Sequence, residues 1–143
     1  IRIDPASVDG AFYLAYASQQ LHQYAPMVAA FDLVQPATPV DREQVTTGRL
    51  AYRAVADPAL RPQALAALKS LSGHQSNVDV AGNLIQMYSS LGEHAAVLPL
   101  LETFCPANPT ACSDLAISPM YTALRADPRF QKLVKKYNTV TVQ

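Results

Sequence analysis

Small and apolar residues recur three and four positions apart along most of this 143-residue chain. The stretch 9–22 shows the pattern in full, with one helical stripe formed by Ala11, Leu14, Ala15, Ser18 and Leu21. The same spacing returns at Ala64, Leu68 and Leu71. Ala, Leu and Gln are abundant and Gly is scarce, which also favours helix. The pattern therefore predicts an all-α protein.

Prolines, glycines and capping residues divide this pattern into pairs of helices. Pro26 is tolerated in the first turn of a helix, whereas Asp57-Pro58 interrupts one and Leu91-Gly92 ends one. We expect Asp41 to cap one helix, and Asn77 or Asp79 to begin another. The predicted helices span about 9–22, 26–34, 41–56, 61–71, 77–91 and 93–104, the last closed by Cys105-Pro106 and Asn108-Pro109.

The chain also repeats itself. A shift of 70 residues gives nine identities over 32 positions, among them Val8-Asp9 with Val78-Asp79. Half of this shift is 35 residues, and Leu50-Ala51 stands where a weaker copy of Leu14-Ala15 would recur. A helix pair of this length cannot bury its apolar stripe alone, so consecutive pairs stack. We therefore predict three repeats over about 8–41, 42–77 and 78–111.

The repeated positions have a common pattern. The first unit carries Ala11, Leu14-Ala15, Ser18, Met27, Phe31 and Pro39. The third carries Ala81, Leu84-Ile85, Tyr88, Leu91-Gly92, Val97, Leu101 and Pro109. This pattern resembles the tetratricopeptide repeat, which implies a superhelix of antiparallel helix pairs. Ser18 replaces the usual Tyr of that family, and Met27 and Val97 replace a small Ala, so we expect wider helix spacing and an irregular superhelix.

The end of the chain carries a second resemblance. Residues 118–137, SPMYTALRADPRFQKLVKKY, are similar to the closing segment of bacterial tetratricopeptide proteins, including winged-helix (CadC/ToxR-like) regulators, some adenylate cyclases and some Ser/Thr kinases. We expect capping helices over about 113–138, where Met120, Leu124, Phe130, Leu133 and Val134 cover the last pair. Because the chain opens with Ile1 and soon reaches Ile3-Asp4-Pro5, we expect a single domain, 1–143, from the C-terminal part of a larger bacterial protein.

In such a stack, the first helix of each pair lines the concave side. Tyr and Arg on that side supply contact area and a partner for carboxylates, and Asn and Gln can bind a peptide backbone. The predicted partner-binding residues are Tyr13, Tyr16, Gln20, Arg49, Tyr52, Asn83 and Gln86. The alternative is a solvated face with some apolar area. Tetratricopeptide domains that bind C-terminal carboxylates carry Lys on this face, where this chain has Phe12, Asp79 and Gly82, so we do not expect that type of ligand.

Charge and motifs exclude several other classes of function. Eleven basic residues balance eleven acidic ones, although the part beyond residue 124 has five basic and one acidic residue, a net +4. Without a global basic field we expect no nucleic-acid binding, and without a long apolar run we expect no membrane insertion. No acid pair, phosphate-binding loop or Ser/His/Asp motif appears, and His22, His74 and His94 have no second ligand at metal spacing. We therefore expect no enzyme, no cofactor and no metal site.

Cys105 and Cys112 are the only cysteines, and a Pro-rich connection separates them. A helix end that returns to a helix start would bring their Cα atoms within about 4.4–6.8 Å, which a disulfide requires. Two alternatives follow: a disulfide in a periplasmic domain, or two buried thiols in a cytosolic one. A periplasmic location is slightly favoured.

Taken with the resemblance, these features predict a protein-interaction or sensory scaffold domain of a larger bacterial regulator. Its concave face would bind another protein or a peptide. The alternatives are a structural or dimerisation spacer attached to a catalytic signalling domain, such as an adenylate cyclase or a Ser/Thr kinase, and a binder of small molecules between helix pairs. The oligomeric state stays open.

Overall fold

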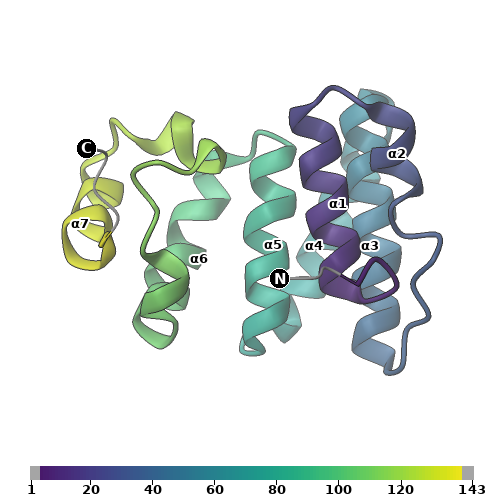
Figure 1. Ribbon diagram of the computed structural model, residues 1–143, viewed down its shortest axis with the longest axis horizontal. Helices are drawn as coiled ribbons and strands as arrows, with labels where there is room; N and C mark the ends of the chain where they lie inside the picture. Colours follow the sequence, from purple (N-terminus) through teal and green to yellow (C-terminus); the bar gives the residue numbers. More distant parts are fainter. Residues whose placement is uncertain (1–3, 140–143) are drawn as a thin grey trace.

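The computed structural model describes residues 4–139, and within this range the protein is all-α, with no strand. The first two helix pairs lie side by side: α1 (Val8–Gln20) with α2 (Tyr24–Ala29), and α3 (Pro39–Ala56) with α4 (Arg61–Leu71). A third pair, α5 (Val78–Ser90) and α6 (His94–Ala107), continues the stack toward the C-terminal helix α7 (Pro128–Tyr137) (Figure 1). The all-α class predicted from the sequence is confirmed.

The helix starts follow local capping chemistry. Thr38 caps α3, because its hydroxyl accepts a hydrogen bond from the Asp41 N–H and the Asp41 carboxylate accepts one from the Thr38 N–H. The expectation that Asp41 is the cap is therefore wrong; it stands three residues inside the helix, in the reciprocal position of a capping box. Asn77 caps α5, as expected, and accepts from the backbone of Asp79 and Val80.

The end of α6 differs from the prediction. The helix continues through Pro106 to Ala107 instead of ending at Phe104. Its last turn is closed by the Asn108 N–H, which donates to the carbonyls of Phe104 and Cys105. By contrast, the end of α5 is as expected, because Gly92 takes a φ of 75°, which favours glycine after a helix.

The C-terminal segment is less helical than expected. Between α6 and α7 the chain forms two short 3-10 helices, η3 (Pro109–Cys112) and η4 (Pro119–Leu124), and only α7 is an α-helix. The prediction of capping helices over 113–138 is therefore wrong for its first half. Prolines at the start of η3 and η4 fix the backbone and remove donors, and the intervening turns keep each helix short. The expected cover does form: Leu124, Phe130 and Leu133 are buried with the apolar side of α6, and Met120 and Val134 pack against them partly buried.

The largest core cluster lies between α1, α2, α3, α4 and α5. Two aromatic contacts mark its centre: Phe12 and Phe31 meet edge to face with centroids 5.0 Å apart, and Tyr52 stacks on Phe31 at 6.0 Å. Gly48 of α3 allows this close approach, since a Cβ there would lie 2.7 Å from the Phe31 ring and 2.9 Å from Phe12. The position therefore needs glycine for space, although it costs helix propensity.

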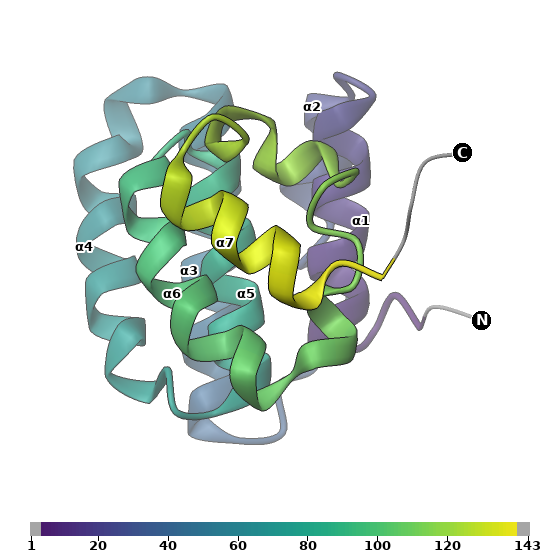
Figure 2. The same ribbon diagram turned by 90° about the vertical axis from the view of Figure 1, so that its left-hand side faces the viewer.

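Helix α1 packs against both α3 and α5 (Figures 1 and 2). In a regular stack of helix pairs, each unit contacts only its neighbours. Here the first and third units meet directly, and two hydrogen bonds join them: Gln86 Nε2 donates to the Phe12 carbonyl at 2.7 Å, and Gln19 Nε2 to the Ser90 carbonyl at 3.0 Å. The three first helices thus form a closed cluster instead of an open row.

Candidate functional site: the groove between α1, α5 and the C-terminal segment

The structure separates the seven residues predicted to form a concave binding face. Tyr52, Asn83 and Gln86 are buried, with 0%, 8% and 7% of their surfaces exposed. The expectation that these three lie on an open face is wrong, because α1 covers the side of α5 that an extended array would leave free. Their role is structural: they hold polar groups inside the core.

A hydrogen-bond network satisfies these buried side chains. The Gln86 amide donates to Phe12 O and to Tyr52 Oη, both at 2.7 Å, and Tyr52 Oη also bonds the Ser90 hydroxyl at 3.1 Å. Asn83 Nδ2 donates to the buried Gln44 Oε1 at 2.8 Å. Burial raises the pKa of Tyr52 to about 12, although the hydrogen bonds with Ser90 and Gln86 oppose the shift. Burial therefore keeps Tyr52 neutral, although its hydrogen bonds act in the opposite direction.

Arg49 lies apart from the other predicted residues. Its guanidinium pairs with Asp32 at 3.4 Å and donates to the Phe31 carbonyl at 3.4 Å, so it fastens the turn after α2 to α3. Both charged groups are largely exposed, which makes the ion pair weak. A partner on α1 and α5 would not need Arg49.

Tyr13 lines a groove of about 430 Å³ between α1, α5, η3 and η4, and the largely buried Asn83 and Gln86 also border it. We call it the α1–α5 groove; it is lined by Asp9, Phe12, Tyr13, Val78, Asp79, Gly82, Asn83, Ile85, Gln86, Phe104, Asn108, Ala111, Met120 and Tyr121. Most of these side chains are apolar or aromatic. Tyr13 is 60% exposed, so most of this residue is open to solvent.

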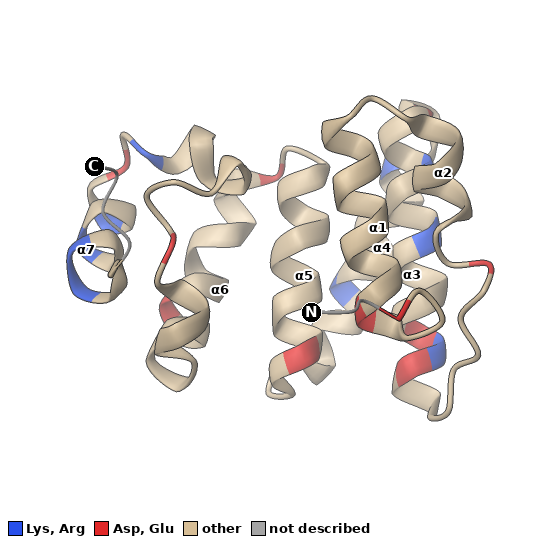
Figure 3. Ribbon diagram, in the orientation of Figure 1, with Lys and Arg blue, Asp and Glu red and all other residues tan. Residues whose placement is uncertain are grey.

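Two carboxylates stand at one end of the α1–α5 groove. Asp9 and Asp79 lie in the first turns of α1 and α5, and Figure 3 shows acidic positions at the starts of both helices. Both side chains are exposed, and neither forms an ion pair with any residue of the described range 4–139. Acidic residues are favourable at helix N-termini in any case. Here they also give an apolar groove a negative end.

The groove adjoins a second apolar pocket that the sequence did not indicate. This pocket, of about 420 Å³, lies between η2 (Ser72–His74), α5 and α6, and Tyr88, Pro99 and Leu100 line it. Val78, Phe104 and Asn108 border both hollows. Phe104 is half-buried between the groove and the pocket. Helical periodicity alone does not show whether such a residue lies in the core or lines a surface hollow.

The other two predicted residues, Tyr16 and Gln20, line a separate, more polar cavity at the C-terminal ends of α1 and α5. Met120 borders both this cavity and the α1–α5 groove. The predicted face is therefore divided among the core, the groove, the polar cavity and the turn after α2.

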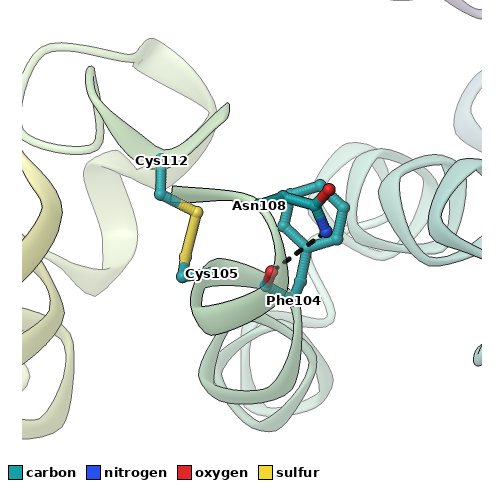
Figure 4. The surroundings of a disulfide bond; sticks show 4 residues. All are labelled: Phe104, Cys105, Asn108 and Cys112. Carbon is teal, nitrogen blue, oxygen red and sulfur yellow. Dashed lines mark hydrogen bonds between the residues drawn. A yellow bond between two sulfur atoms is a disulfide. The ribbon is translucent and has the colours of Figure 1, made fainter. Parts of the chain in front are cut away.

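A disulfide joins Cys105 and Cys112, with an S–S distance of 2.06 Å and a Cα–Cα distance of 5.7 Å (Figure 4). Of the two alternatives that the sequence left open, the structure has the disulfide. It ties the last turn of α6 to η3 and so holds one wall of the α1–α5 groove. Asn108 lies between the two cysteines in sequence, and its amide donates to the Phe104 carbonyl at 3.2 Å, which supports the same turn.

Within residues 4–139, no cluster of three His, Cys, Asp or Glu side chains is arranged to hold a metal ion. No helix in this range is long and apolar enough to cross a membrane. Comparisons of the chain with protein families, curated proteins and solved structures find no match.

Proposed function

We propose that this chain is a protein-interaction domain of the tetratricopeptide type that binds a segment of another protein in the α1–α5 groove. One observation carries the proposal: a groove of about 430 Å³ combines an exposed aromatic ring, Tyr13, with an apolar floor and an acidic end. Aromatic anchors in desolvated grooves supply much of the binding energy of protein interfaces. The all-α stack and the repeat pattern support the same class of function.

The lining specifies the chemistry of the partner. An aliphatic or aromatic side chain would pack against Tyr13 and Phe104, and a Lys or Arg nearby would face Asp9 and Asp79. The two carboxylates steer a basic segment more than they hold it, since exposed charge pairs are weak and are screened by salt. We therefore infer that the partner segment is apolar with at least one basic residue.

The disulfide supports a periplasmic setting for this domain. Disulfides form and persist in oxidising compartments and are rare in the reducing cytosol. A sensory domain of a larger bacterial regulator would fit that setting, with the groove available to a partner outside the cytoplasm.

The proposal is tested by selecting peptides from a random display library on the 143-residue chain and measuring their affinity by fluorescence anisotropy. We expect the selected peptides to contain an apolar anchor and a Lys or Arg. Tyr13→Ala should weaken their binding about tenfold or more. The matched control is Tyr24→Ala, which removes a 49%-exposed tyrosine from α2, outside the groove, and should leave affinity unchanged.

Charge is tested separately. Replacing Asp9 and Asp79 together by Asn should lower the association rate of basic peptides while leaving the folded state intact. It should also make that rate less dependent on salt concentration. Peptides that bind the Tyr13→Ala protein as tightly as the parent, or that show no preference for basic residues, would refute the assignment of the groove.

A further inference from the structure

An apolar stripe on α1 is exposed to solvent. It consists of Leu14, Ala17 and Leu21, which follow one another at helical spacing on the side of the helix away from the buried Ala11 and Ala15. Leu14 is 41% exposed, Leu21 is 67% exposed, and Ala17 is exposed as well. None of the three lines the α1–α5 groove, the apolar pocket or the polar cavity. The α1 stripe is therefore separate from the proposed peptide site.

The same positions are buried in the third repeat. The shift of 70 residues places Leu14 and Leu21 on two identical residues of α5, Leu84 and Leu91. Those two are 0% and 6% exposed, and the residue between them on the same side of α5, Met87, is also fully buried. All three belong to the core cluster that includes residues of α3 and α4, and both of these helices contact α5. In a stack of repeats, such a stripe is the surface on which other helices pack.

The second repeat shows what this stripe contains when solvent covers it. Aligned by the Leu-Ala that the first two repeats share, α3 has Arg53 in place of Ala17, and Asp57 follows it in place of Leu21. Arg53 and Asp57 are exposed and charged, whereas the same positions of α1 are exposed and apolar. Single apolar residues on a surface are ordinary, but aligned ones on one helix face mark an interaction site.

The first helix pair is also free of charge beyond its first turn. Residues 10–31 include most of α1 and all of α2, and they contain no Asp, Glu, Lys or Arg. By contrast, α7 has four basic residues among ten. The cores of protein interfaces are depleted in charged residues. A surface that covers the α1 stripe must be uncharged as well, since a buried charge without a partner is costly.

A second copy of this chain offers such a surface in one orientation only. The stack has two different ends: α7 exposes Arg129, Lys132, Lys135 and Lys136 at one, and the α1 stripe lies toward the other (Figures 1 and 3). If copies packed head to tail, the basic face of α7 would meet an uncharged surface, which gives its charges no partner. If they packed head to head, each stripe would meet an identical one, and no charge would be buried.

We propose that the chain forms a two-fold dimer in which the α1 stripes of two copies pack against each other. In an antiparallel arrangement that crosses at Ala17, Leu14 of each copy lies beside Leu21 of the other, as two-fold symmetry requires. Ala17 has the smallest side chain of the stripe and stands at its centre, so the two helices can approach closely.

Sedimentation velocity of the 143-residue chain over a range of concentrations tests the proposal. We expect a reversible monomer–dimer equilibrium with a Kd in the micromolar range, and no larger species, because a two-fold contact closes on itself. Added salt should not weaken the dimer, since the contact contains no charge. Leu21→Ser should raise the Kd about tenfold or more.

Charges introduced at position 17 test the two-fold symmetry itself. Ala17→Glu and Ala17→Lys should each stay monomeric, because two like charges would meet at the centre of the contact. An equimolar mixture of these two variants should form a heterodimer, since the charges are then opposite. The matched control is Ala66→Glu, the same change at an exposed alanine of α4, which should dimerise like the parent. Circular dichroism should show equal helix content in all of these proteins, because the substituted positions are exposed.

Several results would overturn the inference. One is a parent chain that stays monomeric up to about 1 mM, where even a weak specific contact would be detected. Association that salt weakens, or species that keep growing with concentration, would show a head-to-tail contact through the basic α7 instead. Dimerisation of Ala17→Glu like the parent, or a mixture of the two charged variants that stays monomeric, would refute the two-fold contact at the α1 stripe.

Discussion

Replacing Gln86 by leucine tests whether α1 closes onto α5 in solution. Leucine has a similar volume to glutamine, so the change removes hydrogen bonds without opening a large cavity. The parent side chain is 7% exposed and donates to Phe12 O and Tyr52 Oη, both at 2.7 Å. If α1 lay away from α5, as in an open array, Gln86 would face solvent and its replacement would cost almost nothing.

The expected cost follows from these two bonds. Each intramolecular hydrogen bond contributes about 0.5–1.5 kcal/mol to stability, so losing both should lower the free energy of unfolding by about 1–3 kcal/mol. For a chain of this size that corresponds to a fall in Tm of roughly 3–10 °C. The matched control is Gln63→Leu, the same change at an exposed position of α4, which should stay within about 0.5 kcal/mol.

Urea denaturation followed by circular dichroism measures both variants. A double-mutant cycle of Gln86→Leu with Tyr52→Phe should give a coupling energy of about 0.5–3 kcal/mol, because the two side chains share a hydrogen bond. If Gln86→Leu costs no more than Gln63→Leu and the cycle shows no coupling, the closed packing of α1 on α5 is wrong.

Three further predictions test the core, the disulfide and the buried phenol. Gly48→Ala should cost about 1–3 kcal/mol by overpacking, whereas Gly73→Ala, with nothing within 4 Å of the added methyl, should change the urea midpoint little; equal effects would contradict the tight packing. Reducing the Cys105–Cys112 bond should lower the free energy of unfolding by about 2 kcal/mol, and an unchanged urea midpoint would argue against the closed bond. Because the pKa of Tyr52 is raised to about 12, stability should fall as pH rises between about 10 and 12, less steeply in Tyr52→Phe; identical pH profiles would refute its burial as a neutral phenol.

Most of the helices could be predicted from the sequence because their ends depend on neighbouring residues, although α2 ends at Ala29 and not near Val34 as predicted. Helix α4 runs over Arg61–Leu71, the predicted range, since Asp57-Pro58 and Ser72-Gly73 flank it. The end of α6 was missed because Pro106 suggests a break, whereas the backbone of Asn108 closes one more turn. Such local chemistry can be read from a few adjacent residues.

The site could not be predicted in the same way, because it depends on which helix covers which face. Helical spacing correctly groups Asn83 and Gln86 on one side of α5, but it does not say that α1 lies there. Polar side chains also suit either environment: an amide is stable in water and equally stable in a core that supplies its partners, as Gln44 does for Asn83. The predicted face was therefore taken as an open binding surface, although three of its seven residues are interior.

The polar cavity lay beyond sequence reasoning for a related reason. Tyr16, Ser89 and His94 come from three helices, and no spacing connects them. His94 is the first residue of α6, but its neighbours come from residues more than 70 positions earlier on α1 as well as from α5. Only the approach of the first unit to the third brings these groups together.

The hydrogen bonds between α1 and α5 also bear on how the chain folds. They join residues 71 and 74 positions apart, whereas a linear array of repeats makes mostly short-range contacts and can grow or fray one unit at a time. Closing the first unit onto the third raises the average sequence separation of contacts, which slows folding. It also means that α1 cannot detach without exposing the interior of α5, so residues 8–90 should unfold in a single cooperative step. We therefore expect a repeat pattern in sequence to give a unit that unfolds here as one globule.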